Sequence, residues 1–343
     1  MKRLIVFQFA LMFILVTGFS GIAGAKDVYE LKVTYHHSPT HLIARSIVAA
    51  YTPLDAMSGG RLKIKFFGAG ALAKGLEAYD AIQTGAADLG HITPSYWPGR
   101  FPLTTIGDLP GMIPNALAGT FAFNELTNTT PYIKKEYSEV IVLGWFAATP
   151  YRLIMRDKIT TVKQLKGLRL RSAGGYQTKT IEKLGAVPVM MGSGEIYTSL
   201  SRGLLDGIPY PYASIPPHRF YESCKYLVDN LLFGSLIMGQ IMNKASWDKL
   251  PPDLQAMVKE AGETVGRLCG MNYANDSIMA APFLKTKGVE IFDVPASEEK
   301  QFNEILKPMH EEWIAEMTSK GLPGKEVYDA FTKILNKYTK RWK

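Results

Sequence analysis

Apolar side chains recur with two different periods along the first part of the chain. Residues 31–35 and 62–66 alternate apolar with polar side chains, which is the period of a half-buried strand. Between them, residues 42–57 carry apolar side chains every three or four positions, the period of an amphipathic helix, and a glycine pair at 59–60 ends it. This order predicts a strand, a helix and a second strand.

The same alternation continues as far as residue 243. It predicts helices near 76–84, 176–184 and 194–203, and strands at 88–92, 140–146, 151–155, 168–171, 187–191, 207–210 and 236–243. Repeated strand–helix units imply an α/β fold whose mainly parallel sheets are covered by helices on both faces.

A long helix is predicted after this alternating region. Pro251-Pro252 opens it, and it runs to about Ala281, where Pro282 should break or kink it. About 30 residues at ~1.5 Å each span about 45 Å, which is longer than one compact lobe. We therefore expect this helix to lie across two lobes, with glycines at 262, 266 and 270 allowing close packing. Two amphipathic helices are predicted to follow, one around 302–309 and one around 327–338.

The first 25 residues have the pattern of a secretory signal. Lys2 and Arg3 precede an apolar stretch at 4–16, and residues 23–25 are Ala-Gly-Ala, a small-x-small cleavage site. The apolar stretch is shorter than the ~20 residues that a membrane-spanning helix needs. We expect cleavage after Ala25 and an exported, soluble mature protein that does not span a membrane.

The expected export changes which partners the net positive charge favours. A net charge of +8 in 343 residues would by itself favour nucleic acid or an anionic membrane as a partner. Export excludes nucleic acid by compartment, so the mild positive excess favours a small anionic solute.

Common catalytic motifs are missing from the sequence. It contains no Gly-x-Ser-x-Gly elbow, His-Glu-x-x-His motif, Walker loop or paired Cys-x-x-Cys. We predict a protein that is not an enzyme and has no cofactor. Dispersed catalytic residues leave an exported enzyme on a similar scaffold as the less favoured alternative.

Histidines and cysteines raise two further questions. His36, His37 and His41 are close enough in sequence to suggest metal ligation, but two are adjacent and no cysteine is near. We interpret them as polar loop or pocket-rim histidines and predict no metal site. Cys224 and Cys269 either form a disulfide in an oxidising compartment or remain two buried thiols, and both readings stay open.

Several ordered motifs carry a resemblance to a known family. They are 165–171 (Leu-Lys-Gly-Leu-Arg-Leu-Arg), 184–189 (Leu-Gly-Ala-Val-Pro-Val), 195–197 (Glu-Ile-Tyr), 203–207 (Gly-Leu-Leu-Asp-Gly), 247–254 (Trp-Asp-Lys-Leu-Pro-Pro-Asp-Leu) and 96–101 (Tyr-Trp-Pro-Gly-Arg-Phe). In these the chain resembles the solute-binding proteins of tripartite ATP-independent periplasmic (TRAP) transporters, of the dicarboxylate-type family. The resemblance implies a two-lobed, hinged periplasmic receptor that closes on an organic acid and delivers it to TRAP membrane subunits. A binding component of another transport or sensing system is the alternative.

Two lobes suit the length of the chain, at about 100–200 residues per domain. We place residues 26–148 and about 237–277 in the first lobe. Residues 149–236 and about 278–343, with the C-terminal helices, form the second.

The resemblance assigns one arginine to the ligand. Arg171 stands where the family's Lys-Gly-Leu-x-Leu-Arg motif places the arginine that pairs with a substrate carboxylate. A planar guanidinium matches a carboxylate with two hydrogen bonds, and the end of a strand before a helix favours an anion. Strand alternation alone does not distinguish Arg171 from Arg169, because both side chains lie on one face.

A second clamping arginine of many relatives has no clear counterpart. Tyr151 stands near that place and Arg152 is one residue beyond, on the opposite face of a regular strand. The chain also has small residues around Ser193, where sialic-acid-binding relatives carry an aromatic residue. We therefore hypothesise an aromatic or bulky monocarboxylate ligand. The candidate walls and rim are Tyr96, Trp97, Tyr151, Tyr176, Tyr210, Ser193 and His37, with Arg152 as a possible second cation.

Overall fold

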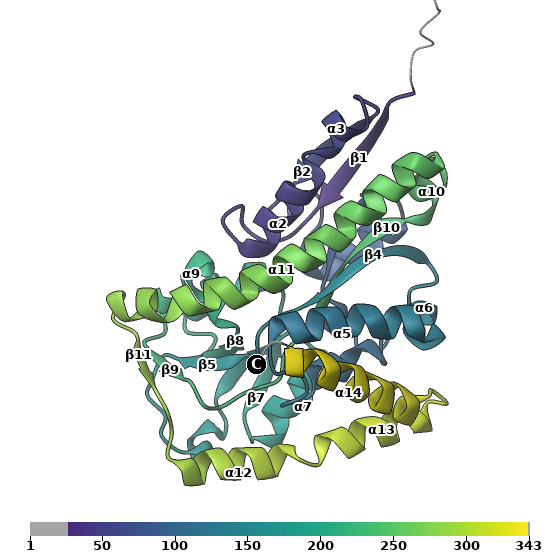
Figure 1. The fold of residues 1–343 in the computed structure, drawn as a ribbon. Helices are drawn as coiled ribbons and strands as arrows, with labels where there is room; N and C mark the ends of the chain where they lie inside the picture. The colour runs from purple at the N-terminus through teal and green to yellow at the C-terminus, as the bar shows by residue number, and fades with distance from the viewer. Residues whose placement is uncertain (1–26, 342–343) are drawn as a thin grey trace, which may run out of the picture.

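The computed structural model describes residues 27–341 and shows two lobes joined along one side by a long helix (Figure 1). The predicted signal peptide at 1–25 lies outside the described residues. In the part of the chain that is described, no helix combines the length and apolar character needed to cross a membrane.

The first lobe is built on a five-stranded sheet with the order β2-β1-β3-β10-β4. Its strands are β1 (Tyr29–Thr34), β2 (Leu62–Phe67), β3 (Leu89–Ile92), β4 (Val140–Ala147) and β10 (Ile237–Asn243). β1 pairs in parallel with β2 and β3, whereas β10 pairs antiparallel with β3 and β4. The helices of this lobe are α2 (Leu42–Tyr51), α3 (Leu54–Met57), α4 (Ala78–Gln83), α5 (Ala116–Thr129) and α6 (Pro131–Glu136).

The second lobe is built on a six-stranded sheet with the order β11-β9-β5-β8-β6-β7. Its strands are β5 (Arg152–Met155), β6 (Arg169–Ser172), β7 (Val187–Met190), β8 (Gly207–Tyr210), β9 (Tyr226–Val228) and β11 (Glu290–Phe292). β5 is antiparallel to both neighbours, and the other pairings are parallel. The antiparallel strands β5 and β10 are those by which the chain enters one lobe from the other. The helices between the strands of this lobe are α7 (Gly175–Lys183), α8 (Ile196–Ser201) and α9 (Ile215–His218).

The long helix α11 (Pro252–Thr286) spans both lobes as predicted. It packs against β4 and α2 on one side and reaches α9 and β11 on the other, following the short helix α10 (Lys244–Asp248) (Figure 1). Of the two effects expected at Pro282, a break or a kink, the break is wrong, because the helix continues to Thr286. Pro282 is exposed, so water can satisfy the carbonyl that loses its helical partner.

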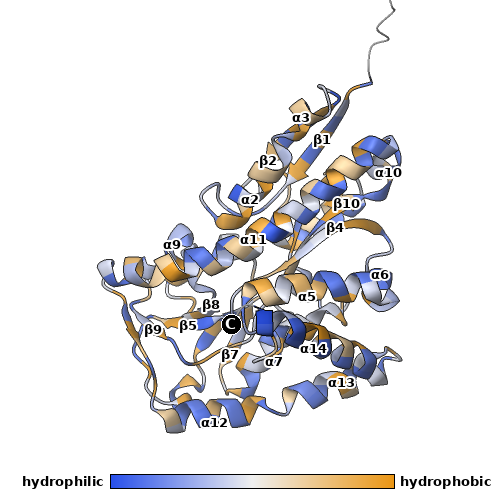
Figure 2. Cartoon of the chain, in the orientation of Figure 1, coloured by the Kyte–Doolittle hydropathy of each residue, from blue (hydrophilic) through white to orange (hydrophobic). Residues whose placement is uncertain are grey.

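The chain ends in three helices where two were predicted. α12 (Ala296–Leu306) and α13 (Met309–Ser319) are separate because Pro308 stands between them, and α14 (Gly324–Arg341) follows. α12 packs against α7, but α14 packs against α5 of the first lobe, where Lys337 pairs with Glu125 at 2.7 Å. The C-terminal helices therefore do not all belong to the second lobe. Figure 2 shows hydrophobic and hydrophilic residues mixed along α11 and α12, as expected for helices with one buried face.

Candidate functional site

Arg171 is a buried cation that has no anionic partner in the part of the chain that is described. It is the next-to-last residue of β6, and its side chain is 1% exposed. Nε and Nη2 donate to the carbonyl of Met191 at 3.2 and 3.0 Å, and Nη2 donates to the hydroxyl of Tyr96 at 3.3 Å. No carboxylate among residues 27–341 forms an ion pair with it, whereas exposed Arg169 pairs with Asp206 at 2.6 Å. A buried charge is costly unless it is paired, so this arrangement favours binding of an anion.

A small cavity of ≈ 20 Å³ opens beside this guanidinium. Its walls come from both lobes and from α11, and they are lined by His37, Thr93, Tyr96, Tyr151, Arg171, Ser193, Tyr210, Leu236, Met238 and Tyr273. The residues follow the carboxyl ends of β1, β3, β6 and β8, which is where ligands of open α/β sheets bind. The volume suits about one water molecule, so the lobes are closed around Arg171 in this arrangement.

Tyr96 connects the two lobes at this cavity. Its hydroxyl oxygen accepts hydrogen bonds from Arg171 and from the backbone N–H of Ser193 at 3.2 Å. With both lone pairs engaged, its own O–H is left to donate to a bound anion. Burial raises the pKa of Tyr210 and of Tyr151, so these hydroxyls also remain protonated donors at physiological pH.

Six of the predicted site residues line this cavity, namely Arg171, Tyr96, Tyr151, Tyr210, Ser193 and His37. Three others do not. Arg152 points away from it, pairs with Asp229 and lies over the ring of Tyr212 at 4.9 Å. The pleat of β5 accounts for this, since Tyr151 lies just before the strand and Arg152 takes the other face.

Tyr176 and Trp97 are the other two that lie elsewhere. Tyr176 donates to Glu316 of α13, outside the cavity. Trp97 packs between Tyr79 and Phe101, with ring centroids 5.9 and 6.4 Å away. Both aromatic side chains therefore serve packing rather than the cavity wall.

Four lining residues were missed from the sequence: Thr93, Leu236, Met238 and Tyr273. Leu236 immediately precedes β10, Met238 lies on β10, and Tyr273 lies on α11. Both elements come late in the chain, far in sequence from Arg171. Leu236, Met238 and Tyr273 are of the type of ordinary core residues, and Thr93 is a single threonine just after β3, so no local pattern marks any of the four.

Five histidines gather immediately behind the cavity. His36, His37 and His41 follow β1, His91 lies on β3 and His218 ends α9, with neighbouring ring centroids 4.1–5.9 Å apart. Burial lowers the pKa of all five, to about 3 for His91 and about 4 for His218, so they are neutral at pH 7.

The placement of these histidines departs from the prediction. Only His37 faces the cavity, and the cluster is a buried one rather than a polar loop. Two groups of three could hold a metal ion by their geometry: His36, His37 and His91, or His37, His41 and His218. Cys224 and Cys269 are free and buried, which corresponds to the thiol reading.

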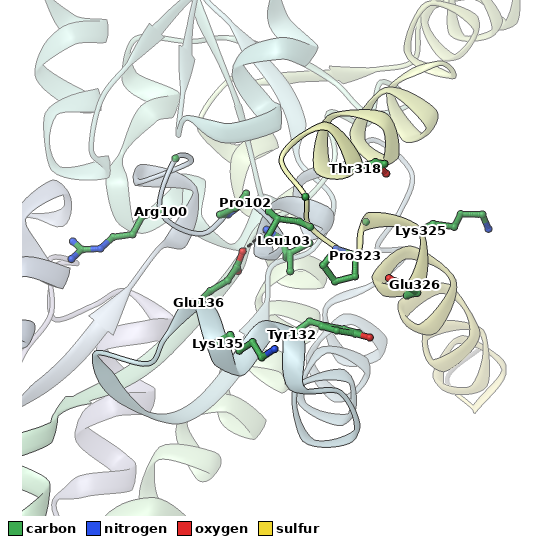
Figure 3. A pocket seen from close by; sticks show the side chains of 14 residues that line it. Arg100, Pro102, Leu103, Tyr132, Lys135, Glu136, Thr318, Pro323, Lys325 and Glu326 are labelled. Atoms are coloured by element: carbon green, nitrogen blue, oxygen red, sulfur yellow. Dashed lines mark hydrogen bonds between the residues drawn. The ribbon is translucent and has the colours of Figure 1, made fainter.

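A larger hollow of ≈ 820 Å³ lies on the surface near the turn between α13 and α14. Figure 3 shows Arg100 and Lys325 at opposite ends of it, extending away from one another. Glu136 is already engaged there by the backbone N–H groups of Leu103 and Thr104, at 2.5 and 3.0 Å. With no convergent buried charge, this hollow lacks the chemistry found beside Arg171.

Comparisons with known proteins agree with this architecture. The family model described as bacterial extracellular solute-binding protein, family 7, matches residues 35–316. The monocarboxylate 2-oxoacid-binding periplasmic protein of Nostoc sp. strain PCC 7120 is 25% identical over 285 residues, which is 76% of either chain.

Solved structures show the same two-lobed fold. The TRAP solute-binding protein from Rhodoferax ferrireducens T118, crystallised with copurified benzoate, superposes with a TM-score of 0.84 at 26% identity. It covers 91% of this chain and 99% of its own. A TRAP protein from Bordetella bronchiseptica with bound (R)- and (S)-mandelate has a TM-score of 0.82 at 21% identity, covering 90% and 99%. The resemblance drawn from the sequence motifs is confirmed.

Proposed function

Because this chain belongs to family 7 of the bacterial extracellular solute-binding proteins, we propose that it is a periplasmic TRAP receptor for an organic monocarboxylate. It captures the acid between its lobes and delivers it to the membrane subunits without catalysing a reaction. The observation that carries the proposal is the buried guanidinium of Arg171, which has no carboxylate partner among the described residues.

The carboxylate is held by one arginine and by hydroxyl donors. Arg171 is anchored through Nε and Nη2 on Met191, which fixes the plane of the guanidinium before the ligand arrives. A charge-assisted pair with the edge of the guanidinium that lines the cavity is stronger than a neutral hydrogen bond, and the hydroxyl of Tyr96 adds a second donor. Preorganisation of this kind reduces the entropy lost on binding.

The body of the ligand is apolar and flat. Tyr151, Tyr210 and Tyr273 provide aromatic walls, and Leu236 and Met238 provide aliphatic ones. An aromatic acid exceeds the volume of the closed cavity, so the lobes open to admit it and close less tightly around it. The benzoate in the Rhodoferax ferrireducens relative supports this choice, and the 2-oxoacid named for the Nostoc relative is the smaller alternative.

A dicarboxylate is disfavoured because the cavity offers one cation. Arg152 is engaged with Asp229 on the other face of β5, and the cavity lining contains no further arginine or lysine. A second carboxylate would be buried without a partner, which costs several kcal/mol.

The test is thermal melting of the mature protein, stripped of ligand by unfolding and refolding, with benzoate, pyruvate and succinate. Ligand at about 100 times its dissociation constant adds about 2.7 kcal/mol, which raises the melting temperature by several degrees. We expect a shift with benzoate, and none with succinate at equal concentration. An Arg152→Ala variant should respond as wild type does.

Other outcomes have defined meanings. A shift with succinate that disappears in Arg152→Ala would contradict the single-cation site. No shift with any acid would contradict the receptor proposal, and chemical conversion of the acid during prolonged incubation would favour the enzyme reading.

A further inference from the structure

Histidines from separate parts of the chain converge next to the anion site. The chain has six histidines, and five of them lie in this cluster. His36 and His37 follow β1, and His91 lies on β3 of the same sheet. The binding of a carboxylate at Arg171 leaves all but His37 without a role, because the others do not line that cavity.

Three of these histidines are buried with unused nitrogens. His36, His37 and His91 are 7%, 5% and 0% exposed. Neither ring nitrogen of His36 or of His37 has a hydrogen-bond partner among the described residues, and the backbone carbonyl of Gly239 approaches the ring of His91. Leaving buried polar atoms unpaired costs free energy, so the four unpaired nitrogens of His36 and His37, beside a ring nitrogen of His91 that Gly239 does not engage, indicate that something else binds there.

A fourth unpaired polar group lies beside them. Gln240 on β10 is directly opposite His91 on β3, and directly opposite residues of an antiparallel pair have side chains on the same face. Gln240 is 0% exposed, and its amide oxygen and nitrogen both lack a partner in the described structure. Its side chain can orient a ligating imidazole or contribute an oxygen.

The spacing of the rings suits ligation of one ion. The ligand nitrogens of His36, His37 and His91 all lie within 4.8 Å of one another. Tetrahedral ligation with bonds of about 2.0–2.1 Å per imidazole places ring centroids about 5 Å apart. The centroid of His91 lies 5.1 Å from that of His36 and 5.2 Å from that of His37. The His36–His37 distance of 4.2 Å needs a small outward rotation of one ring.

Adjacent histidines can share a site here because the chain bends. β1 ends at Thr34, and a bend falls at His37, so the alternation of a regular strand does not apply to this pair. Their rings consequently lie close together rather than on opposite faces.

The other group of three is the weaker candidate. His41 caps α2 by accepting from the backbone N–H of Ile43 through Nδ1 at 3.2 Å. Its Nε2 therefore carries the proton and donates to the hydroxyl of Ser214 at 2.9 Å. With both nitrogens engaged, His41 has none left for a metal ion.

We propose that His36, His37 and His91 form a binding site for one divalent transition-metal ion of the zinc class. Neutral imidazole is a preferred ligand of Zn²⁺, Ni²⁺, Co²⁺ and Cu²⁺, whereas Ca²⁺ and Mg²⁺ require oxygen ligands that this group does not supply. The fourth position is open to water, to Gln240 or to an anion. An anion near Arg171 would also offset the repulsion between the ion and the guanidinium.

A hollow that is open to the surface borders the site at His36. His36 lines a hollow of ≈ 390 Å³ between the lobes, whose wall also includes Glu77 and Glu195. Both glutamates are exposed and outnumber Lys74 in the same wall, so the net charge of this wall favours the approach of a cation.

The experiment is a calorimetric titration of the mature, tag-free protein, stripped with a chelator, with Zn²⁺ and separately with Co²⁺ in the absence of organic acid. We expect one equivalent to bind, a rise in melting temperature, and the visible absorption of tetrahedral Co²⁺. Because no carboxylate is present, failure here is separate from failure of the proposed receptor function.

Variants decide whether these three residues are the ligands. His36→Gln and His91→Gln should each weaken binding by about 100-fold or more, since even outer-shell partners of metal ligands are worth about 10–100-fold. The matched control is His310→Ala, which removes the sixth histidine at the hydrogen bond of α13 to Tyr328. It should bind as wild type does, and circular dichroism should show every variant to be folded.

Three results would overturn the proposal. One is the absence of a stoichiometric binding event in the wild-type protein. Another is binding that survives in folded His36→Gln and His91→Gln. The third is binding that depends on His41, tested as His41→Asn to retain the helix cap, but not on His91, since this would assign the ion to the other group.

Discussion

Arg169 and Arg171 share a strand and a face, yet their surroundings are opposite. Arg169 is exposed at the start of β6 and its guanidinium pairs with Asp206, while Arg171 is enclosed two residues later by Met191 and Tyr96. The two arginines differ because Asp206 lies beside Arg169 and the first lobe covers Arg171. The alternation of side chains along a strand predicts neither neighbour. The resemblance to the family was therefore needed to select Arg171.

The buried histidines make stability depend on pH. Burial lowers the pKa of His91 to about 3 and of His218 to about 4, so below pH 6.5 the unfolded chain binds protons that the folded protein does not. In a chelating buffer, the free energy of unfolding should therefore fall as pH decreases from 6.5 to 5, by about 1.4 kcal/mol per pH unit for each histidine. Urea unfolding at pH 7.5, 6.5 and 5.5 measures this.

The substitution His218→Phe isolates the contribution of one histidine to the pH dependence of the free energy of unfolding. The ring of His218 stacks on Phe220 at 5.1 Å, so His218→Phe keeps an aromatic ring there and removes the titrating group. In His218→Phe the free energy of unfolding should change with pH by about 1.4 kcal/mol per pH unit less than in wild type. Equal slopes in wild type and His218→Phe would contradict this account.

Residue type predicted the cavity only in part. The aromatic residues Tyr96, Tyr151 and Tyr210 and the small Ser193 do meet at Arg171. Trp97 and Tyr176 have the same chemical character but turn toward the first-lobe core and toward α13. The direction of an aromatic side chain depends on the residues it packs against, and these can be far away in the sequence. A local sequence pattern therefore does not predict it.

Among the secondary-structure elements, α11 connects the fold to the site. Its glycines at 262 and 266 lie against β4, so that an added Cβ at Gly262 would stand 2.3 Å from Cβ of Leu143, and one at Gly266 would stand 2.6 Å from the carbonyl of Trp145. The same helix brings Tyr273 to the cavity. The spacing of these glycines correctly predicted a close approach.

Gly266→Ala should therefore destabilise the protein. On an exposed helix this change stabilises by about 1 kcal/mol, but here the methyl group meets backbone, and overpacking costs about 1–3 kcal/mol. Urea unfolding should show that loss, with Met271→Ala on the outer face of α11 within about 0.5 kcal/mol of wild type. An unchanged or raised stability of Gly266→Ala would mean that α11 does not pack closely on β4.

Short and late elements were harder to predict than α11. β9 and β11 have three residues each, too few for a period to be recognised, and α5 carries Gly119 and several threonines that weaken its helical pattern. The long-range packing of α14 on α5 is likewise absent from any local signal. The sequence was most informative where apolar periodicity was long and regular.

At the scale of the whole molecule, ligand binding and lobe closure involve the same residues. Tyr96 of the first lobe bonds to Arg171 and to the N–H of Ser193 in the second, so the contact that closes the lobes also completes the anion site. Under the proposed function, a carboxylate bound at Arg171 stabilises the closed arrangement by the same contacts, and this would couple capture of the ligand to recognition by the membrane subunits.

Calorimetric titration of the stripped protein with the best-bound monocarboxylate tests the central role of Arg171 most directly, in the wild type and in Arg171→Met and Arg169→Met. Loss of a buried charge partner costs about 2–5 kcal/mol, so Arg171→Met should raise the dissociation constant by at least about 30-fold, while Arg169→Met should leave it within about twofold. A folded Arg171→Met protein that binds the acid as tightly as wild type would contradict the assignment of Arg171 as the carboxylate anchor.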